Sequence, residues 1–331
     1  MVLRNWAVCV LAVACLLISP LAAQQYQRNA PLQQGGYPSA SAGQSAEQQA
    51  PSPYRMAGQP LGTAQAAQSQ TPYRLAERSN PMPNRPAMPG LGEPAQPNEH
   101  PLMPALRWAK EGKRQIENVR DYSAVMVKRE RFDGKISDYE YMFLKVRHRP
   151  LSVYIYFLDP PASKGQEVIY IQGQNNGKMW AHTTGLRHKI VGTVSLDPNG
   201  PIAMRGNHYP ITEIGIHNLV DRLIQVGEHD AQYGECEVKF MPGAKINGRT
   251  CTCLQITHPV PRRNFLYHLA RIFVDDELTV PIRLEAYDWP SQPGGQPELV
   301  EEYTYLNMKL NNGFTDADFD TRNPSYGFKA R

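Results

Sequence analysis

The segment from residue 24 to residue 100 contains no Val, Ile, Phe, Trp, Lys, Asp or Cys, while it holds 12 of the 29 prolines and 13 glutamines. Such a composition leaves almost no apolar side chains to bury against the entropy cost of ordering the chain. We therefore expect residues 24–100 to form a disordered Pro/Gln/Ala-rich linker. Residues 101–331 contain many Val and Ile and are numerous enough for one domain with a proper core.

An excess of charge of one sign is also missing. The chain has 35 Lys and Arg against 31 Asp and Glu, a formal net charge of +4, and this small excess is spread over the N-terminal segment, the linker and the remainder. Proteins that bind nucleic acid neutralise the phosphate backbone with clustered basic residues. The even charge therefore argues against nucleic acid as a partner.

Familiar catalytic and cofactor motifs are absent: a Gly-x-Ser-x-Gly elbow, a phosphate-binding loop, a dinucleotide glycine fingerprint and a His-Glu-x-x-His metal site. The run Asp316-x-Asp318-x-Asp320 begins like a calcium loop. However, Thr321 stands where that loop needs glycine, and Gly327 where it needs a bidentate glutamate. We therefore predict that the protein is not an enzyme and has no metal and no cofactor.

The N-terminus has the pattern of a secretory signal. Arg4 precedes an apolar run from Trp6 to Ile18, and residues 1–23 end in Leu-Ala-Ala. We expect export to the periplasm or cell envelope with cleavage after Ala23, and peripheral rather than integral membrane association. An uncleaved anchor and a lipoprotein signal ending at Cys15 are the alternatives.

Three cysteines remain after the signal: Cys236, Cys251 and Cys253. Cys251 and Cys253 lie two apart in a predicted strand, so both point to the same face and a disulfide between them is not expected. Two interpretations stay open in an oxidising compartment. Either Cys236 pairs with one of them, or all three are buried or half-buried free thiols.

The remaining pattern alternates strands and tight turns. Asp133-Gly134 predicts a hairpin, because both residues accept positive φ. Apolar spacing predicts helices over residues 102–119 and 211–226. Strands are expected at 122–131, 136–147, 152–158, 167–172, 178–183, 187–191, 233–240, 249–257, 265–275, 280–287 and 299–310. We predict an α+β fold in which a curved antiparallel sheet of about eleven strands bends around two or three helices, with 192–210 as an irregular crossing.

One internal repeat is present in the linker. Pro53-Tyr54-Arg55-Met56-Ala57 recurs as Pro72-Tyr73-Arg74-Leu75-Ala76. It is either a short docking motif used twice or a duplication in low-complexity sequence.

Aromatic residues are concentrated in the first half of the sheet. Alternation puts Tyr154 and Tyr156 on a common face, with Phe143 and Trp180 on neighbouring strands. Aromatic residues on strands usually belong to the core or form cross-strand pairs, but an aromatic face of a curved open sheet is either covered by helices or offered to a ligand. Both interpretations stay open, and the ligand interpretation predicts Phe143, Tyr154, Tyr156 and Trp180 as the lining of an apolar site.

Short motifs along residues 102–328 carry a family resemblance. Arg149-Pro150, the Pro160-Pro161 corner and Asn176-Gly177-Lys178-Met179-Trp180 resemble the corresponding series in the LolA-like periplasmic lipoprotein carriers. The chain is more closely similar to an exported bacterial family of unknown function that is related to those carriers. The marks of that family here are Gly165-x-Glu167-Val168-x-Tyr170, Asp276-Glu277-Leu278-x-x-Pro281 and Asp318-Phe319-Asp320-x-x-Asn323-Pro324-x-Tyr326-x-Phe328.

The resemblance implies an unclosed half-barrel whose helices plug the concave side and whose apolar cavity binds acyl chains. It also implies that an arginine at the Arg-Pro motif holds the helical lid, which makes Arg149 the lid latch. Our first hypothesis is an exported, non-enzymatic protein that binds a lipid or an acylated lipoprotein, with lipoprotein sorting as one role. The alternatives are a cell-envelope structural or sensor domain that binds a protein partner, and a hydrolase on an unfamiliar framework.

Overall fold

The computed structural model describes residues 73–74, 96–184 and 192–328. The predicted signal peptide and most of the predicted linker lie outside these residues, as does the strand expected at 187–191. Within the described part, no helix is both long enough and apolar enough to span a bilayer.

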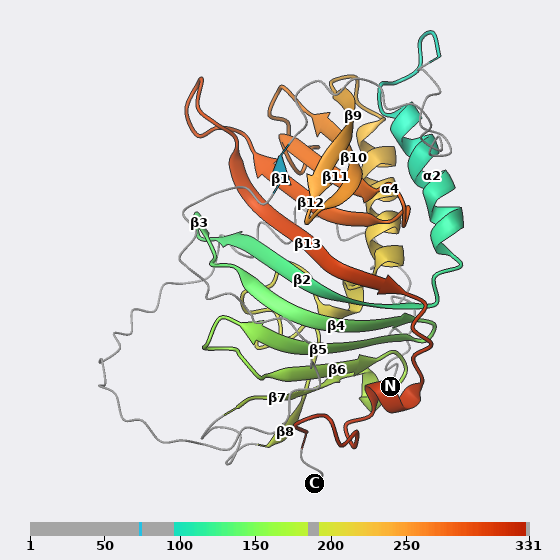
Figure 1. Cartoon of the computed structure of the whole chain (residues 1–331). Helices are drawn as coiled ribbons and strands as arrows, with labels where there is room; N and C mark the ends of the chain where they lie inside the picture. The colour runs from blue at the N-terminus through green and yellow to red at the C-terminus, as the bar shows by residue number, and fades with distance from the viewer. Residues whose placement is uncertain (1–72, 75–95, 185–191, 329–331) are drawn as a thin grey trace, which may run out of the picture. The chain divides into compact units, whose positions relative to one another are not determined.

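The described residues form one antiparallel sheet of thirteen strands (Figure 1). The strands are β1 (Tyr73–Arg74), β2 (Asp121–Phe132), β3 (Lys135–Ile136), β4 (Glu140–His148), β5 (Leu151–Asp159), β6 (Glu167–Ile171), β7 (Met179–His182), β8 (Thr193–Leu196), β9 (Glu237–Ile246), β10 (Arg249–Thr257), β11 (Leu269–Asp275), β12 (Pro281–Asp288) and β13 (Glu298–Leu310). Their order is β1-β9-β10-β11-β12-β13-β2-β4-β5-β6-β7-β8, with β3 beside β2. Because β1 and β8 end the path as its two edges, the sheet is unclosed, which confirms the predicted fold class.

Turns and bulges shape this sheet. The hairpin expected at Asp133-Gly134 is present, and both residues have positive φ, 49° and 75°. The pairing register shifts within β4–β5, β9–β10, β11–β12, β12–β13 and β13–β2. Each bulge bends its strand and increases the local twist, so the long strands curve and leave a concave face.

Two α-helices, α2 (Met103–Ile116) and α4 (Ile216–Asp230), pack against each other and cover the concave side of the sheet (Figure 1). Their contact is close at Gly227, where an added Cβ would lie 2.9 Å from Leu106 Cδ2. The sequence predicted that the second helix stops at Gly227. The helix instead continues to Asp230, and Gly227 lies within it, where it provides the space into which Leu106 of α2 packs.

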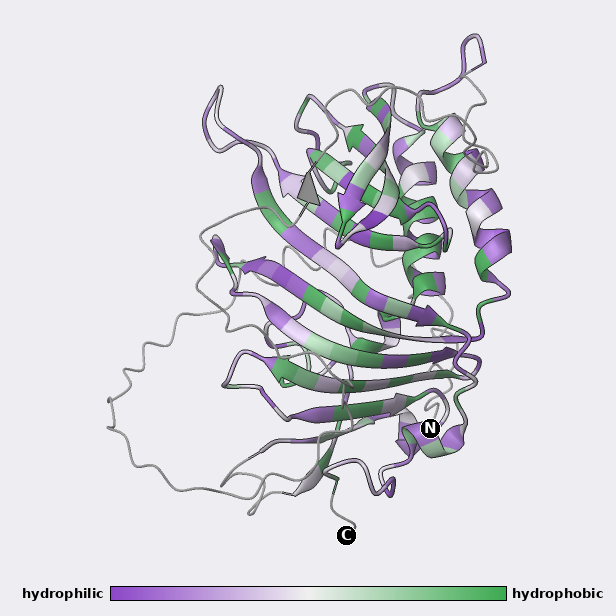
Figure 2. Cartoon of the chain, viewed as in Figure 1, coloured by the Kyte–Doolittle hydropathy of each residue, from purple (hydrophilic) through white to green (hydrophobic). Residues whose placement is uncertain are grey.

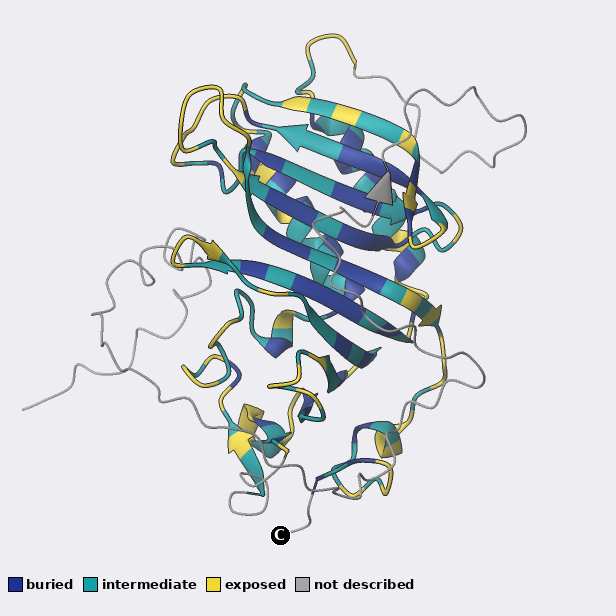
Figure 3. Cartoon of the chain, turned by 60° about the vertical axis from the view of Figure 1, so that its left-hand side comes forward, coloured by how far each residue is buried: buried dark blue, intermediate teal, exposed yellow. Residues whose placement is uncertain are grey.

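Side chains alternate between the two faces along β4 and β5. Met142, Leu144 and Ile155 belong to the main core on the concave face, while Lys145 and Tyr154 pair across the strands on the opposite face. Figure 2 shows the resulting alternation of apolar and polar positions along the strands, and Figure 3 shows the corresponding alternation of buried and less buried ones.

Two further boundaries differ from the sequence prediction. The segment 192–210 is not wholly irregular, because its β-branched Thr193 and Val194 begin strand β8, which pairs with β7. The strand expected at 136–147 is two strands, β3 and β4, separated by residues 137–139. The strand expected at 233–240 lies further along the chain, as β9 at Glu237–Ile246, and the strand expected from residue 265 begins at Leu269. The other predicted strands within the described residues agree with the structure to within one or two residues at their ends.

Candidate functional site: a cavity between the sheet and helix α4

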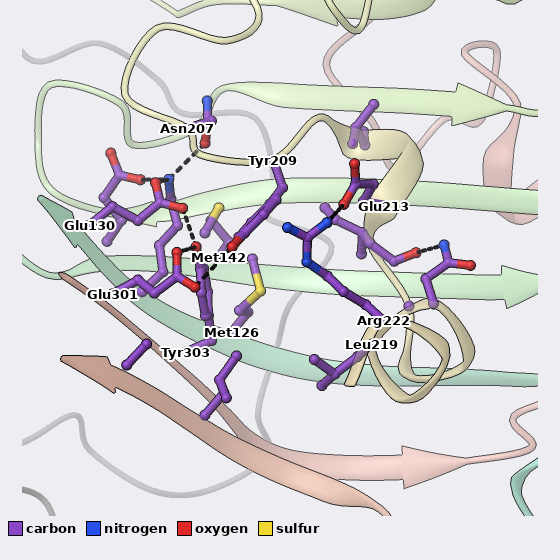
Figure 4. A pocket seen from close by; sticks show the side chains of 18 of the residues that line it. Met126, Glu130, Met142, Asn207, Tyr209, Glu213, Leu219, Arg222, Glu301 and Tyr303 are labelled. Atoms are coloured by element: carbon purple, nitrogen blue, oxygen red, sulfur yellow. Dashed lines mark hydrogen bonds and ion pairs between the residues drawn. The ribbon is translucent and has the colours of Figure 1, made fainter. Parts of the chain in front are cut away.

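An apolar cavity of about 480 Å³ lies between the concave face of the sheet, helix α4 and the segment 197–215 (Figure 4). This volume is in the range of pockets that bind small molecules. Its apolar lining includes Met126, Met142, Ile155, Phe157, Val168, Met179, Ala181, Leu196, Ile214, Leu219, Leu223, Val226, Ile256, Leu266, Ile272 and Leu284. A smaller cavity of about 90 Å³ lies beneath α2 and shares Leu102, Leu223 and Ile272 with the first.

Lys128 lies in the polar part of the lining, and its ammonium group makes three hydrogen bonds. Its Nζ donates to Glu130 Oε2 at 2.9 Å, to the carbonyl oxygen of Gly206 at 2.8 Å and to Asn207 Oδ1 at 2.7 Å. The side chain is 6% exposed. Since an ammonium group has three protons, these contacts use all of them and attach the 206–207 loop to the sheet.

Glu301 is the centre of a second buried polar group. It accepts hydrogen bonds from Tyr209 at 2.9 Å, from Tyr267 at 2.8 Å and from Nδ1 of His208 at 2.7 Å. Burial lowers the pKa of His208, but the hydrogen bond to Glu301 and the charges of Glu301 and Glu130 outweigh it and leave this pKa raised. Tyr303 bridges Glu130 and Glu301 (Figure 4). The two carboxylates are therefore structural acceptors with several donors each.

Arg222 brings a charge from helix α4 to the cavity wall. Its Nη1 lies 3.1 Å from Glu213 Oε2, and its guanidinium carbon lies 4.5 Å from the centre of the Tyr209 ring (Figure 4). A cation over an aromatic face is attracted by the ring quadrupole. These two contacts connect α4 to the 209–213 segment on the same side of the cavity.

The four aromatic residues predicted as ligand lining lie on the other face of the sheet. Phe143, Tyr154, Tyr156 and Trp180 pack with the C-terminal residues Phe314, Phe319, Tyr326 and Phe328. Tyr154 is fully buried and stacks on Tyr326 with ring centres 4.1 Å apart. None of the four is among the described residues that line the cavity. The residues next to them in sequence, such as Met142, Ile155 and Phe157, line the cavity instead.

The run Asp316-x-Asp318-x-Asp320, which begins like a calcium loop, lies in this C-terminal segment. Asp316 and Asp318 form ion pairs with Arg147 and Lys145, at 2.7 and 2.9 Å, which fasten the segment to the sheet. Asp318 also accepts a hydrogen bond from the backbone N–H of Thr315. In the described part of the chain, no cluster of three or more His, Cys, Asp or Glu side chains has the arrangement of a metal site.

The predicted latch residue, Arg149, is exposed in the turn between β4 and β5. Its neighbour His148 makes the contact with the helix instead. The imidazole of His148 stacks on that of His217 in α4, with ring centres 3.7 Å apart and parallel planes. Nε2 of His217 in turn lies 2.7 Å from the carbonyl oxygen of Ile116 at the end of α2. No local sequence pattern pairs these two histidines, which are far apart in the chain.

The three thiols are free in the structure, which resolves the alternatives left open by the sequence. Burial raises the pKa of Cys236, Cys251 and Cys253 to about 12 in each case. Thiols with so little thiolate are poor nucleophiles and poor metal ligands.

A family model described as "Protein of unknown function (DUF1571)" matches residues 119–328. The chain belongs to the DUF1571 family. The match spans strands β2 to β13 and the C-terminal segment, and so includes every residue that lines the cavity of this DUF1571 protein except Leu102. It agrees with the expected relation to a family of unknown function. No curated protein matches the sequence.

Several solved structures are similar to the DUF1571 protein. The lipoprotein LppX of Mycobacterium tuberculosis is 12% identical over 66% of this chain and 100% of that one, with a TM-score of 0.36. A DUF1329 family protein from Desulfovibrio piger is 14% identical over 67% and 98%, with a TM-score of 0.33. A LolA superfamily protein from Nitrosomonas europaea is 11% identical over 64% and 97%, with a TM-score of 0.28.

Proposed function

We propose that this DUF1571 protein is an exported, non-enzymatic binding protein that holds a lipid or the acyl chains of a lipoprotein between its sheet and helix α4. The observation that carries the proposal is the apolar cavity of about 480 Å³ on the helix-covered face. Each methylene group transferred from water into such a space contributes roughly 0.8 kcal/mol. An acyl chain therefore gains most of its binding free energy from length alone.

The composition of the lining supports an acyl ligand. Met126, Met142 and Met179 all contribute to the wall. Methionine is unbranched and adapts its shape to irregular apolar partners, which suits chains of differing length and unsaturation. The carboxylates of Glu130 and Glu301 already accept several hydrogen bonds, so a binding role fits this wall better than acid–base catalysis.

The site also supports a movable lid. Helix α4 supplies one wall through Leu219, Leu223 and Val226. Its ion pairs Lys110–Glu228 and Lys113–Asp221 connect it to α2, the other helix on this face. The His148–His217 stack connects it to the end of strand β4, and the Arg222–Glu213 ion pair connects it to the 209–213 segment. Displacement of α4 would open the cavity without breaking a strand of the sheet. Binding of an acyl chain in place of water then favours closure.

The test compares two adjacent residues that point to opposite faces. Met142 lines the cavity, whereas Phe143 packs beneath the C-terminal segment. We expect Met142→Trp to weaken binding of a fluorescent C16 fatty acid at least tenfold, and Phe143→Trp to leave it within twofold. Ala181→Leu, at a half-buried lining position, provides a milder block if Met142→Trp unfolds the protein.

Purification from the envelope fraction supplies an independent measurement. Native mass spectrometry and organic extraction should recover a co-purified lipid or acylated peptide. A protein that is recovered empty and also fails to bind the added fatty acid would rule the proposal out. Equal effects of Met142→Trp and Phe143→Trp would place the binding site elsewhere.

A further inference from the structure

Strand β9 is the outermost long strand at one end of the sheet, and only the two-residue strand β1, which comes from the linker, lies beyond it. β1 pairs with β9 in antiparallel register, Tyr73 opposite Ile246 and Arg74 opposite Lys245. Tyr73 and Arg74 are the centre of the second copy of the five-residue repeat. The linker residues that pair with the domain therefore belong to the repeat that occurs twice in the linker.

The edge accepts a strand mainly at this end. An open edge exposes unpaired N–H and C=O groups, and charged side chains or proline protect it. In β9 the first part carries exposed Glu237 and Lys239, and Pro242 has no N–H to offer. Gly243 follows with a φ of 85° at a bulge. Beyond the bulge, residues 244–246 form the short stretch with which β1 pairs.

The repeat has the features of a short edge strand. Its proline can only begin such a strand, because it lacks an N–H, and its tyrosine favours extended backbone. The first copy, Pro53–Ala57, differs from the second, Pro72–Ala76, at one position, where Met56 stands in place of Leu75. Since pairing uses backbone groups, the two copies offer β9 the same partner.

The observed pairing is short, because only two residues of β1 lie opposite β9. A two-residue strand is held largely by its tether to the domain, which makes it exchangeable with a second copy on the same chain.

We propose that the β9 edge at residues 244–246 is a docking site for the Pro-Tyr-Arg repeat of the same chain, and that its two copies occupy the edge in turn. Exchange between Tyr73-Arg74 and Tyr54-Arg55 moves the point of attachment by 19 residues along the linker. The length of linker N-terminal to the point of attachment then takes one of two values, depending on which copy is docked. This inference is independent of the ligand proposed for the cavity.

Disulfide trapping tests it in the full mature chain with Cys236→Ser as background. Lys245→Cys is combined with Arg74→Cys, with Arg55→Cys or with Gln65→Cys, and bridge formation is followed by peptide mass spectrometry. Gln65 lies between the two copies. Simple tethered collision predicts that the yield falls steadily from position 74 through 65 to 55, because effective concentration decreases with linker length.

Docking of both copies predicts a different order. Arg74→Cys and Arg55→Cys should trap within fivefold of each other, and each at least fivefold above Gln65→Cys. A yield at position 55 equal to or below that at 65 would show that the first copy does not dock. A yield at position 74 no higher than at 65 would show that neither does. Bridges found between two molecules would assign the edge to a second copy of the protein and overturn the same-chain occupant.

A backbone variant supplies the second measurement. Arg74→Pro removes the N–H of the residue opposite Lys245 in the second copy, and Arg55→Pro removes the corresponding N–H of the first. Ile246 closes the hairpin with Arg249, so the backbone groups of Lys245 are the ones that face β1. Hydrogen exchange at Lys245 should stay within threefold of the parent for either single variant and rise at least tenfold for the double variant, while β11 is unchanged. Loss of protection in Arg74→Pro alone, or none in the double variant, would contradict the proposal.

Discussion

The imidazole rings of His148 and His217 lie parallel with their centres 3.7 Å apart, one at the end of strand β4 and the other in helix α4. Gly215 at the start of α4 allows this approach, since an added Cβ would lie 3.3 Å from the His148 ring. The stack joins the sheet to the helix that covers the cavity. It occupies the place in the fold where the sequence predicted an arginine latch.

Acid should loosen this contact. Burial, then the charges of His217 and Arg149, lower the pKa of His148 from 6.5 to about 3, and Tyr122 is the other ring beside it. In the unfolded or open state the proton is taken up near pH 6.5, so the closed state loses stability progressively as the pH falls from about 6.5 toward 3. We expect faster hydrogen exchange in residues 216–230 at pH 5 than at pH 7.5, after correction for intrinsic rates.

His148→Phe keeps an aromatic ring but cannot take up a proton. This variant should show a weaker pH dependence of exchange in α4 than the parent protein. His229→Gln, at a half-exposed position near the end of the same helix, is the control and should behave like the parent. An identical pH response in His148→Phe and the parent would show that another group governs opening.

The C-terminal segment should stabilise the domain without affecting the cavity. Phe319 is 1% exposed and packs against the aromatic face that contains Tyr154. Phe319→Ala should lower the free energy of unfolding by about 3–5 kcal/mol in urea titration, whereas binding of the fatty acid stays within twofold. Phe314→Ala, at a half-buried position, should cost less. A large loss of binding with no loss of stability would show that this face takes part in ligand recognition.

Lys128 should be essential for the loop that borders the cavity. Lys128→Met removes three hydrogen bonds and leaves Glu130 without its buried cation. Breaking a buried pair by removing one partner costs about 3–5 kcal/mol. We expect a loss of that size in urea unfolding, together with faster proteolysis near residues 206–207. Lys135→Met, at an exposed hairpin position, is the control, and an equal small effect of both substitutions would contradict this role of Lys128.

The thiols should be unreactive in the folded protein. Burial raises the pKa of Cys251 and Cys253 to about 12, so almost no thiolate is present at pH 8. Alkylation by iodoacetamide should therefore be at least a hundredfold slower in buffer than in 8 M urea, with half-buried Cys236 the first to react. Rapid labelling of Cys251 in buffer would indicate that strand β10 opens readily.

Local sequence signals were sufficient for most of the elements. Asp133-Gly134 forms the predicted hairpin, and β10 has the predicted bounds, Arg249–Thr257, because β-branched alternation ends there at clear turn residues. Local signals did not suffice to predict which face of the sheet each aromatic residue occupies. The pairing of Phe143 with Tyr156 shows that they share a face, but both faces of this half of the sheet are apolar. Alternation alone therefore could not tell which face the helices cover.

The sequence by itself determined the strand-rich α+β character, the antiparallel order of neighbouring strands and the family relation, because turns, periodicity and short motifs depend on nearby residues. Only the tertiary structure decided where the cavity lies and what closes it. The C-terminal segment reaches back some 160 residues to cover Tyr154 and Trp180, which leaves Met142 and Ile155 to face α4. The residue that contacts His217 in α4 is His148 and not the predicted Arg149. Contacts between distant segments depend on the assembled curvature of the sheet, which no local pattern encodes.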